Sequence, residues 1–310
     1  MAIDVTAVLV TFNSEDGIEE TITQLESALS HLSAEIIAVD NASADNTVPI
    51  LRRCLRNGRI IALPENIGYG PGLNVGIAAA QGRHVILMND DIRFDSACVD
   101  RLVAVLDSSD DIALVGPRIV HVDGAQAPAA RTYLPGWRDE WARVLDLVTR
   151  RRMRTNYPTA GAPVDVGLLI AACLMGKTEV LRTLGGFNES FFFYGEDIDL
   201  CRRLDRAGYR RVLAPEALAI HHHEIATDRR YRRHVFLSRM LNARDTYYRI
   251  WLSRPSRMLI NLYRALGPGE QPFKLRFHLR RAIYDGPNVR SLRRLPALAT
   301  DGGRKGAARA

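Results

Sequence analysis

The stretch VTAVLVTFNSEDGIEETITQLESALSHLSAEIIAVD, residues 5–40, indicates the fold. Two nearly continuous apolar runs, at 5–12 and 35–40, flank a segment whose pattern predicts a helix at about 15–30. Apolar runs of this kind are typical of strands that are buried on both faces of a sheet. The order strand, helix, strand therefore predicts a parallel pair joined by a crossover helix.

The same alternation continues through the first half of the chain. Further strands are predicted at 59–63, 84–89 and 112–116, and further helices at 45–56, 71–81 and 96–108. We therefore expect an α/β fold with a mostly parallel sheet flanked by helices. Ligands of such sheets bind beyond the carboxyl ends of the strands. Polar residues cluster at these ends, namely Thr11, Asn13, Asp40, Asn41, Asn66, Asn89, Asp90 and Asp91.

Charge divides the chain into two parts. From residue 229 onward there are 20 lysines and arginines against four acids, although the whole chain has 42 against 35. We predict a catalytic domain at 1–228 and a basic, helical extension at 229–310, disordered from about 298. Such an extension suits an anionic membrane surface or nucleic acid, but no nucleic-acid motif surrounds its aromatic residues. Packing on the domain and a homodimer contact are the alternatives.

Other global features predict an intracellular protein. Four scattered cysteines form no CxxC pair, so neither zinc nor a disulfide framework is expected. The start of the chain has an acid where a signal peptide has basic residues. The longest nearly apolar run, 164–175, is too short to span a bilayer. The irregular stretch 117–160 is expected to be a mobile loop over the site.

The run GGFNESFFFYGEDIDLCRRL, residues 185–204, places Glu196, Asp197 and Asp199 at the start of a predicted helix. Acids are favoured in the first turn of any helix by the helix dipole. Four aromatic residues precede them here, however, and an apolar wall raises the pKa of a carboxyl toward the range of a general base. The run therefore predicts a catalytic acid or base.

Two further groups suggest a metal site. Asn89-Asp90-Asp91 ends a predicted strand, and hard divalent cations prefer carboxylate oxygens together with waters and substrate phosphates. The run His221-His222-His223 ends a later apolar strand and could supply a third ligand or contact a diphosphate. Each group also has an ordinary interpretation, as a turn and as an incidental surface run.

Two loops have the composition of ligand-binding loops. Asp40 could accept hydrogen bonds from a ribose or a base, with Ser43 capping the next helix. The segment 66–74 (NIGYGPGLN) would let a phosphate approach the backbone, although an ordinary turn explains it equally well. It follows the third strand, whereas a dinucleotide-binding loop would follow the first.

In this order the motifs resemble family 2 glycosyltransferases with the GT-A fold, over about residues 5–227. The matching elements are VTFNS, VDNASAD, ENIGYGPGLN, NDD, GGFNESFFFYGEDIDL and the histidine run. The chain is most similar to the bacterial rhamnosyltransferase-like branch, which builds cell-wall or surface polysaccharide.

The resemblance implies a role for each motif. Thr11, Asn13 and Asp40 would line the nucleotide pocket, with Asn66, Gly68, Asn89 and Asp90 near the nucleotide sugar. The first position of the family's metal-binding DxD is Asn89 here, so Asp91 is the expected ligand of Mg²⁺ or Mn²⁺. His222, or alternatively His221, would join it. Asp197 is the expected general base, with Glu196 as the alternative.

The resemblance also implies the reaction. We expect a metal-dependent, inverting hexosyltransferase that moves a sugar from a nucleotide-diphosphate donor, with dTDP-rhamnose as the first candidate. The acceptor would be a hydroxyl of a glycan or lipid-linked glycan, at the cytoplasmic face of the cell membrane. The alternatives are an NAD-dependent dehydrogenase and a non-catalytic protein that binds nucleotides or nucleic acid.

Overall fold

The computed structural model describes residues 3–95, 97–131, 134, 158–222 and 233–258. The chain divides into two compact units, Met1–Ser253 and Arg254–Ala310. The second unit is described only at 254–258. All of the elements below belong to the first unit.

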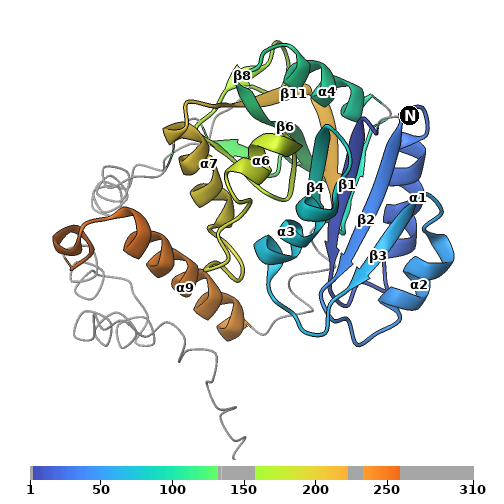
Figure 1. The fold of residues 1–310 in the computed structure, drawn as a ribbon, viewed down its shortest axis with the longest axis horizontal. Coiled ribbons are helices and arrows are strands. Elements are labelled where there is room, and N and C mark those ends of the chain that lie inside the picture. Colours follow the sequence, from blue (N-terminus) through green and yellow to red (C-terminus); the bar gives the residue numbers. More distant parts are fainter. Residues whose placement is uncertain (1–2, 96, 132–133, 135–157, 223–232, 259–310) are drawn as a thin grey trace, which may run out of the picture. The chain divides into compact units, whose positions relative to one another are not determined.

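A nine-stranded mixed sheet forms the centre of the first unit, and helices flank it (Figure 1). Its strands lie in the order β3-β2-β1-β4-β10-β6-β11-β5, and β8 also pairs with β11. The strands of the sheet and of a separate β7–β9 pair are β1 (Val5–Thr11), β2 (Ala34–Asp40), β3 (Gly58–Ala62), β4 (His84–Asn89), β5 (Ile92–Phe94), β6 (Ile112–His121), β7 (Ala130–Arg131), β8 (Val164–Asp165), β9 (Leu168–Leu169), β10 (Cys173–Lys177) and β11 (Arg210–His221). The helices are α1 (Ile18–Leu29), α2 (Thr47–Cys54), α3 (Tyr69–Ala79), α4 (Cys98–Asp107), α6 (Thr178–Thr183), α7 (Glu196–Arg206) and α9 (Arg233–Trp251).

The amino-terminal half of the sheet is parallel, as the sequence predicts. β1 pairs in parallel with both β2 and β4, and every residue of β1 is buried. β10 then pairs antiparallel with both β4 and β6. This inserted antiparallel strand separates the parallel half from the parallel pair of β6 and β11.

The predicted elements of the first half are all present, with ends shifted by a few residues. The largest difference concerns the apolar strand expected to end at the histidine run, which is part of one long strand, β11, that begins at Arg210 and has a register shift between Ala214 and Leu218. The mobile loop predicted at 117–160 begins instead as an extension of β6 to His121. Residues 135–157 of that loop lie outside the described residues.

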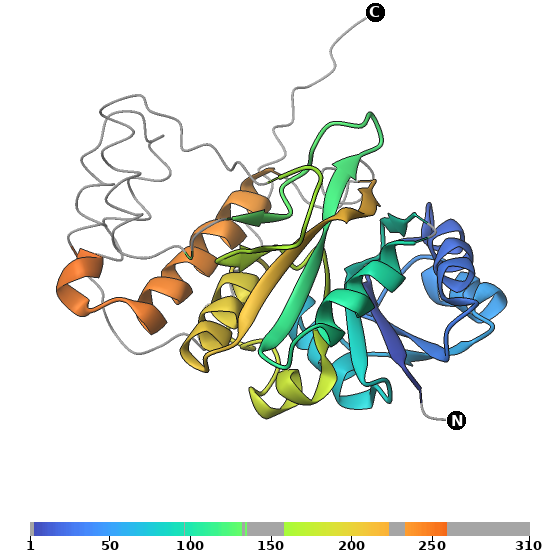
Figure 2. The same ribbon diagram turned by 90° about the horizontal axis from the view of Figure 1, so that it is seen from above.

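Helix α9 begins the basic region and packs within the first unit, beside α7 (Figures 1 and 2). Its side chains Leu241, Tyr247 and Tyr248 are buried there. For this helix the packing alternative therefore holds. The expected boundary at 228 falls within 223–232, outside the described residues, and stays a prediction. None of the described helices is long and apolar enough to cross a membrane.

Candidate active site

The sheet register brings three predicted ligand residues to one edge. Thr11 is paired with Asp40, and its neighbour Val10 is paired with Asn89. Because β1, β2 and β4 run in parallel, their carboxyl ends open at the same side of the sheet. The loops that follow these strands therefore form one rim.

Asp40 organises one part of this rim. Its side chain is 2% exposed and accepts hydrogen bonds from the Thr11 hydroxyl (3.0 Å), the Ser43 hydroxyl (2.5 Å) and the Ser43 backbone N–H (3.0 Å). A buried carboxylate needs such partners to offset its desolvation. Asp40 thus holds the loop after β2, and its contact with a nucleotide stays a prediction.

The expectation that Ser43 caps the next helix is wrong. Helix α2 begins later, after Asn46, and has no side-chain hydrogen bond at its cap. The Ser43 hydroxyl instead donates to Asp40 and accepts the backbone N–H of Asn13 (2.9 Å). Asn13 has a φ of 52° and accepts the N–H of Ala44 (2.8 Å), so the loops after β1 and β2 are joined.

The glycine-rich segment contacts the acidic motif. The N–H of Tyr69 donates to the carbonyl oxygen of Phe192 (2.9 Å), and a Cβ on Gly68, at a φ of 104°, would overlap that same carbonyl. A Cβ on Gly70 would lie 3.3 Å from the Cβ of Glu196. These glycines therefore let two protein segments approach closely. The expected approach of Gly68 to a phosphate stays a prediction.

Asn66 and Asn41 fix the entry to this segment. The Asn66 side-chain oxygen accepts the N–H of Gly68 (3.1 Å). The Asn41 amide accepts the N–H of Ile67 (3.0 Å) and donates to the carbonyl of Gly68 (2.9 Å). Asn66 thus acts on the loop itself, and its expected place beside the nucleotide stays a prediction.

The two aspartates after β4 have different surroundings. Asp90 is buried, and its carboxylate accepts a hydrogen bond from the Ser14 hydroxyl. The Thr21 hydroxyl donates to the backbone carbonyl of Asp90 (2.9 Å). Asp90 thereby ties β4 to the loop and helix that follow β1.

Asp91 faces the histidine run. Its Oδ1 lies 3.1 Å from Nε2 of His221, and Nδ2 of Asn89 lies 3.5 Å from the same nitrogen. The antiparallel pairing of His221 with Ile92 creates this contact. His222 contributes its backbone N–H to the carbonyl of Asp91 (3.0 Å), and burial followed by the charge of Arg93 lowers the pKa of its ring. The geometry thus favours the alternative, His221, over His222.

A carboxylate and an imidazole at a strand end form a donor set that suits Mg²⁺ or Mn²⁺, with waters and phosphate oxygens completing the shell. Asp91 and His221 supply that pair. Among the described residues, no group of three or more His, Cys, Asp and Glu side chains is arranged to hold a metal. These residues therefore fit an ion that is shared with a substrate.

The acidic pair lies at the start of α7, after two residues with left-handed backbone, Tyr194 (φ 71°) and Gly195 (φ 84°). Glu196 is 5% exposed, and burial, with a contribution from the charge of Asp197, raises the pKa of its carboxyl to about 8. Burial also raises the pKa of Asp197, although the backbone N–H of Ile198 donates a hydrogen bond to its carboxylate (2.7 Å) and opposes this rise. The pKa shift that the sequence predicts therefore has the expected direction.

Two contributors to this site were not predicted. Arg131, on β7, places a positive charge that lowers the pKa of Asp197. Asn74, inside α3, donates to the carbonyl of Phe187 (2.8 Å) and accepts its N–H (2.7 Å). Asn74 could have been suspected as a lone polar side chain in an apolar helix. Arg131 gives no local signal in the sequence.

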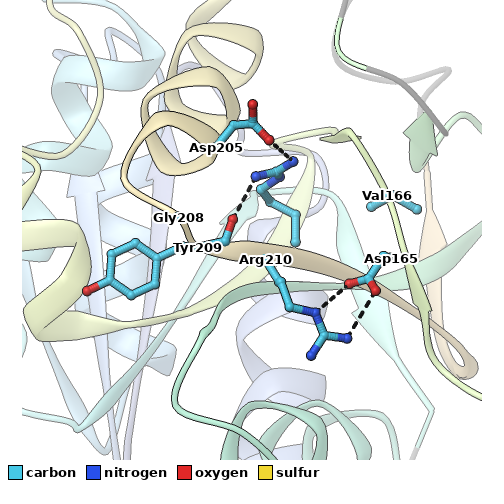
Figure 3. A pocket seen from close by; sticks show the side chains of 7 residues that line it. Asp165, Val166, Asp205, Gly208, Tyr209 and Arg210 are labelled. Atoms are coloured by element: carbon cyan, nitrogen blue, oxygen red, sulfur yellow. Dashed lines mark hydrogen bonds and ion pairs between the residues drawn. The ribbon is translucent and has the colours of Figure 1, made fainter.

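A separate hollow of about 250 Å³ lies at the opposite end of β11 (Figure 3). Arg210 binds Asp165 there through two hydrogen bonds (2.9 and 3.0 Å), and Arg211 donates to Asp205 (2.8 Å). Since β11 separates this hollow from His221 by its whole length, the hollow is not part of the rim.

The fold is that of the GT-A glycosyltransferases. The chain belongs to glycosyl transferase family 2, whose model matches residues 6–184. This membership supports the glycosyltransferase interpretation over the dehydrogenase and nucleic-acid-binding alternatives.

The chain is 28% identical to an N-acetylglucosaminyl-diphospho-decaprenol L-rhamnosyltransferase of Mycobacterium tuberculosis, over 72% of this chain and 77% of the relative. Two solved structures share its fold. One is the mannosyltransferase PcManGT of Pyrobaculum calidifontis with GDP-Man and Mn²⁺ (TM-score 0.54, 18% identity, 93% of this chain and 77% of that one). The other is GalNAc-T7 with UDP, GalNAc and Mn²⁺ (TM-score 0.52, 14% identity, 71% of this chain and 44% of that one).

Proposed function

We propose that this glycosyltransferase is an inverting enzyme in which Asp197 is the general base. The buried acidic pair at the start of α7 carries the proposal, because burial raises the pKa of both adjacent carboxyls and the charge of Asp197 raises that of Glu196 further. Glu196, with a pKa raised to about 8, holds its proton at neutral pH. Asp197 is therefore the member that we assign as the base, and its raised pKa lies in the direction that makes a carboxylate a better proton acceptor.

In the proposed reaction Asp197 removes the proton of an acceptor hydroxyl. The hydroxyl oxygen forms a bond to the anomeric carbon as the bond to the nucleotide diphosphate breaks on the opposite face. This single displacement inverts the anomeric centre and needs no protein nucleophile. Burial raises the pKa of Asp197, and the charge of Arg131 opposes part of that rise, which favours the ionised form of the base.

Asp91 and His221 would hold a Mg²⁺ or Mn²⁺ ion, with His222 as the alternative imidazole. When bound, such an ion neutralises charge on the leaving diphosphate. The Asn89 amide contacts His221, and the backbone N–H of His222 donates a hydrogen bond to the carbonyl of Asp91. These two contacts orient Asp91 and His221. Both structural neighbours were solved with Mn²⁺, which supports this assignment.

The relative in M. tuberculosis supports a donor and an acceptor. Its name describes transfer of L-rhamnose to an N-acetylglucosaminyl-diphospho-lipid. We take dTDP-rhamnose as the donor and a lipid-linked glycan as the acceptor, in the synthesis of cell-wall or surface polysaccharide. Thr11, Asn13, Asp40, Asn66 and Gly68 would surround the nucleotide.

Ligand-dependent stabilisation tests the donor and the metal together. The melting temperature of the full chain should rise with dTDP-rhamnose and Mn²⁺, because a ligand that binds only the folded state stabilises it. The rise should be smaller for UDP-GlcNAc and GDP-mannose, and smaller for dTDP-rhamnose with EDTA. Equal shifts for all three sugars would refute the rhamnose donor, and an EDTA-insensitive shift would refute the metal.

Asp91→Ala should abolish the Mn²⁺ component of the shift. Asp110→Ala is the matched control, because Asp110 is an exposed aspartate just before the amino end of β6, whereas the rim lies at the carboxyl ends of the parallel strands. A full Mn²⁺ response in Asp91→Ala would remove this residue from the metal site.

A further inference from the structure

One face of α9 contacts the acidic motif along its length, from the aromatic loop before the acids to the last turn of α7. The face consists of four residues spaced four apart, which lie on one side of a helix: Arg239, Ala243, Tyr247 and Trp251. These residues lie beyond the family match, which ends at 184.

The first half of this face contacts the loop before the acids. The Arg239 guanidinium lies 4.6 Å from the centre of the Phe192 ring. A Cβ built on Gly195 would lie 3.7 Å from the Cβ of Ala243. Tyr194 and Gly195, between these contacts, have left-handed φ angles of 71° and 84°. Bulky residues keep such angles only where their surroundings hold them.

The second half contacts α7 itself. The Trp251 indole N–H donates to Oδ1 of Asp199 (2.8 Å), whose side chain is fully buried. The guanidinium groups of Arg202 and Arg206 lie 5.2 and 4.4 Å from the centre of the Trp251 ring. Arg202 also donates to the Tyr247 hydroxyl (2.5 Å).

Asp199 connects these contacts to the rest of the site. Its second oxygen accepts the Nε–H of Arg203 (2.8 Å). Arg203 in turn donates to the carbonyls of Leu184 (2.8 Å) and Gly186 (2.6 Å), in the loop that leads to the acidic motif. The third acid of the motif is therefore the point where α9, α7 and this loop meet.

We propose that Trp251 is a positioning residue for the catalytic pair and acts through Asp199. The proposal rests on the proposed role of Asp197. Asp197 and Asp199 lie in the same turn of α7, so the hydrogen bond from Trp251 fixes the direction in which that turn presents the base. Small displacements of a catalytic group lower the rate steeply, whereas donor binding depends on the other end of the rim.

The test measures kcat and donor affinity of the full chain with dTDP-rhamnose and N-acetylglucosaminyl-diphospho-decaprenol. Trp251→Phe removes the N–H but keeps a ring for Arg202 and Arg206. It should lower kcat by about tenfold and leave the dissociation constant of the donor within about twofold. Ile250→Ala, at an exposed neighbouring position, is the control and should have the kcat of the wild type.

A double-mutant cycle separates positioning from general stabilisation. If Trp251 acts through Asp199, adding Trp251→Phe to Asp199→Asn should lower kcat little further, because residues that act through one contact are not additive. Independent multiplication of the two losses would overturn the proposal. A folded Trp251→Phe variant with unchanged kcat would overturn it as well.

Amide hydrogen exchange gives a readout that needs no substrate. Trp251→Phe should accelerate exchange at 196–200 and leave β1 and β4 unchanged, since local opening reports local contacts. Unchanged exchange at 196–200 would refute the contact's ordering role. A wild-type chain that transfers no rhamnose from this donor to this acceptor would instead refute the proposed function. Amide hydrogen exchange would still test the role of Trp251.

Discussion

Glu196 combines burial, an oxygen that is unpaired among the described residues, and a raised pKa. It is 5% exposed, its Oε2 atom has no hydrogen-bond partner within the described part of the chain, and its pKa is raised to about 8. Desolvation is the first cause and the charge of Asp197 the second. A buried carboxyl in this state is neutral at the pH where its exposed counterparts are ionised.

This state predicts an unusual dependence of stability on pH. The folded protein retains a proton on Glu196 that the unfolded chain loses near pH 4.5. The free energy of unfolding should therefore fall as pH rises from about 4.5 to about 8. Glu196→Gln should remove this part of the fall, so that between pH 5 and 8 the wild type loses on the order of 3 kcal/mol relative to the variant.

Urea denaturation at several pH values measures this difference. Glu65→Gln is the control, because Glu65 is exposed and its variant should follow the wild-type curve. Parallel curves for the wild type and Glu196→Gln would show that Glu196 is ionised in the folded protein. That result would also return Glu196 to consideration as the base.

The histidine run gives a second prediction at this scale. His221→Ala should weaken Mn²⁺ binding by about tenfold, since loss of a ligand or of its hydrogen-bonded partner typically has such an effect. His222→Ala should change it little, because the described contact of His222 with Asp91 uses its backbone. Calorimetric titration of Mn²⁺ into the protein with dTDP checks both variants, and the opposite ranking would restore His222 as the ligand.

Sequence reasoning could identify this run but not the residue within it. A strand directs alternate side chains to opposite faces, so a shift of one residue in the predicted end of β11 exchanges His221 and His222. The pairing of His221 with Ile92 brings the ring of His221 to Asp91, and that pairing depends on β5, a strand of three residues with no pattern of its own. The contacts of Ser14 with Asp90 and of Asn41 with Ile67 and Gly68 were not predicted, because the partners are far apart in the sequence.

At the scale of elements, α3 and the acidic loop depend on each other through glycine. Gly68→Ala adds a methyl group that meets the Phe192 carbonyl and forces alanine to a φ of 104°. Gly124→Ala forces a φ of 80° with nothing within 4 Å, so it isolates the backbone cost. We expect a loss of about 1 kcal/mol for Gly124→Ala and about 3 kcal/mol for Gly68→Ala.

Urea denaturation checks this pair of variants. Equal losses would mean that the contact between Gly68 and Phe192 adds nothing beyond backbone strain. Gly68→Ala should also lower turnover of the folded enzyme, because the same loop carries the acids.

Most elements of the first half were predictable because long apolar runs and amphipathic helices are local patterns. The strand order was not, since no periodicity reveals that β10 inserts between β4 and β6. The very short strands β7, β8 and β9 were missed because two residues contain no measurable period. They are held by pairing and by α7, which are tertiary effects.

In the whole molecule, the described structure gives no role to the excess of basic residues after residue 229. The buried face of α9 removes Leu241 and Tyr248 from any membrane-binding role, whereas Met240 and Ile250 are exposed. The remaining basic region, 259–310, lies outside the described residues. Its binding to an anionic membrane stays a prediction.

Vesicle co-sedimentation checks that prediction on the full chain. Binding should be strong for vesicles with anionic lipid at low salt, weak for neutral vesicles, and reduced at high salt, because each lysine or arginine near such a surface contributes about 1 kcal/mol. Equal sedimentation with both kinds of vesicle, or none with either, would favour packing or a homodimer as the role of the extension.

The most direct test of the central claim is the turnover of Asp197→Asn with dTDP-rhamnose, Mn²⁺ and N-acetylglucosaminyl-diphospho-decaprenol. We predict that the wild type forms a product with inverted anomeric configuration, determined by NMR. The variant should bind the donor as the wild type does and lose roughly two to four orders of magnitude in kcat. Wild-type turnover by Asp197→Asn, or a product with retained configuration, would contradict the account.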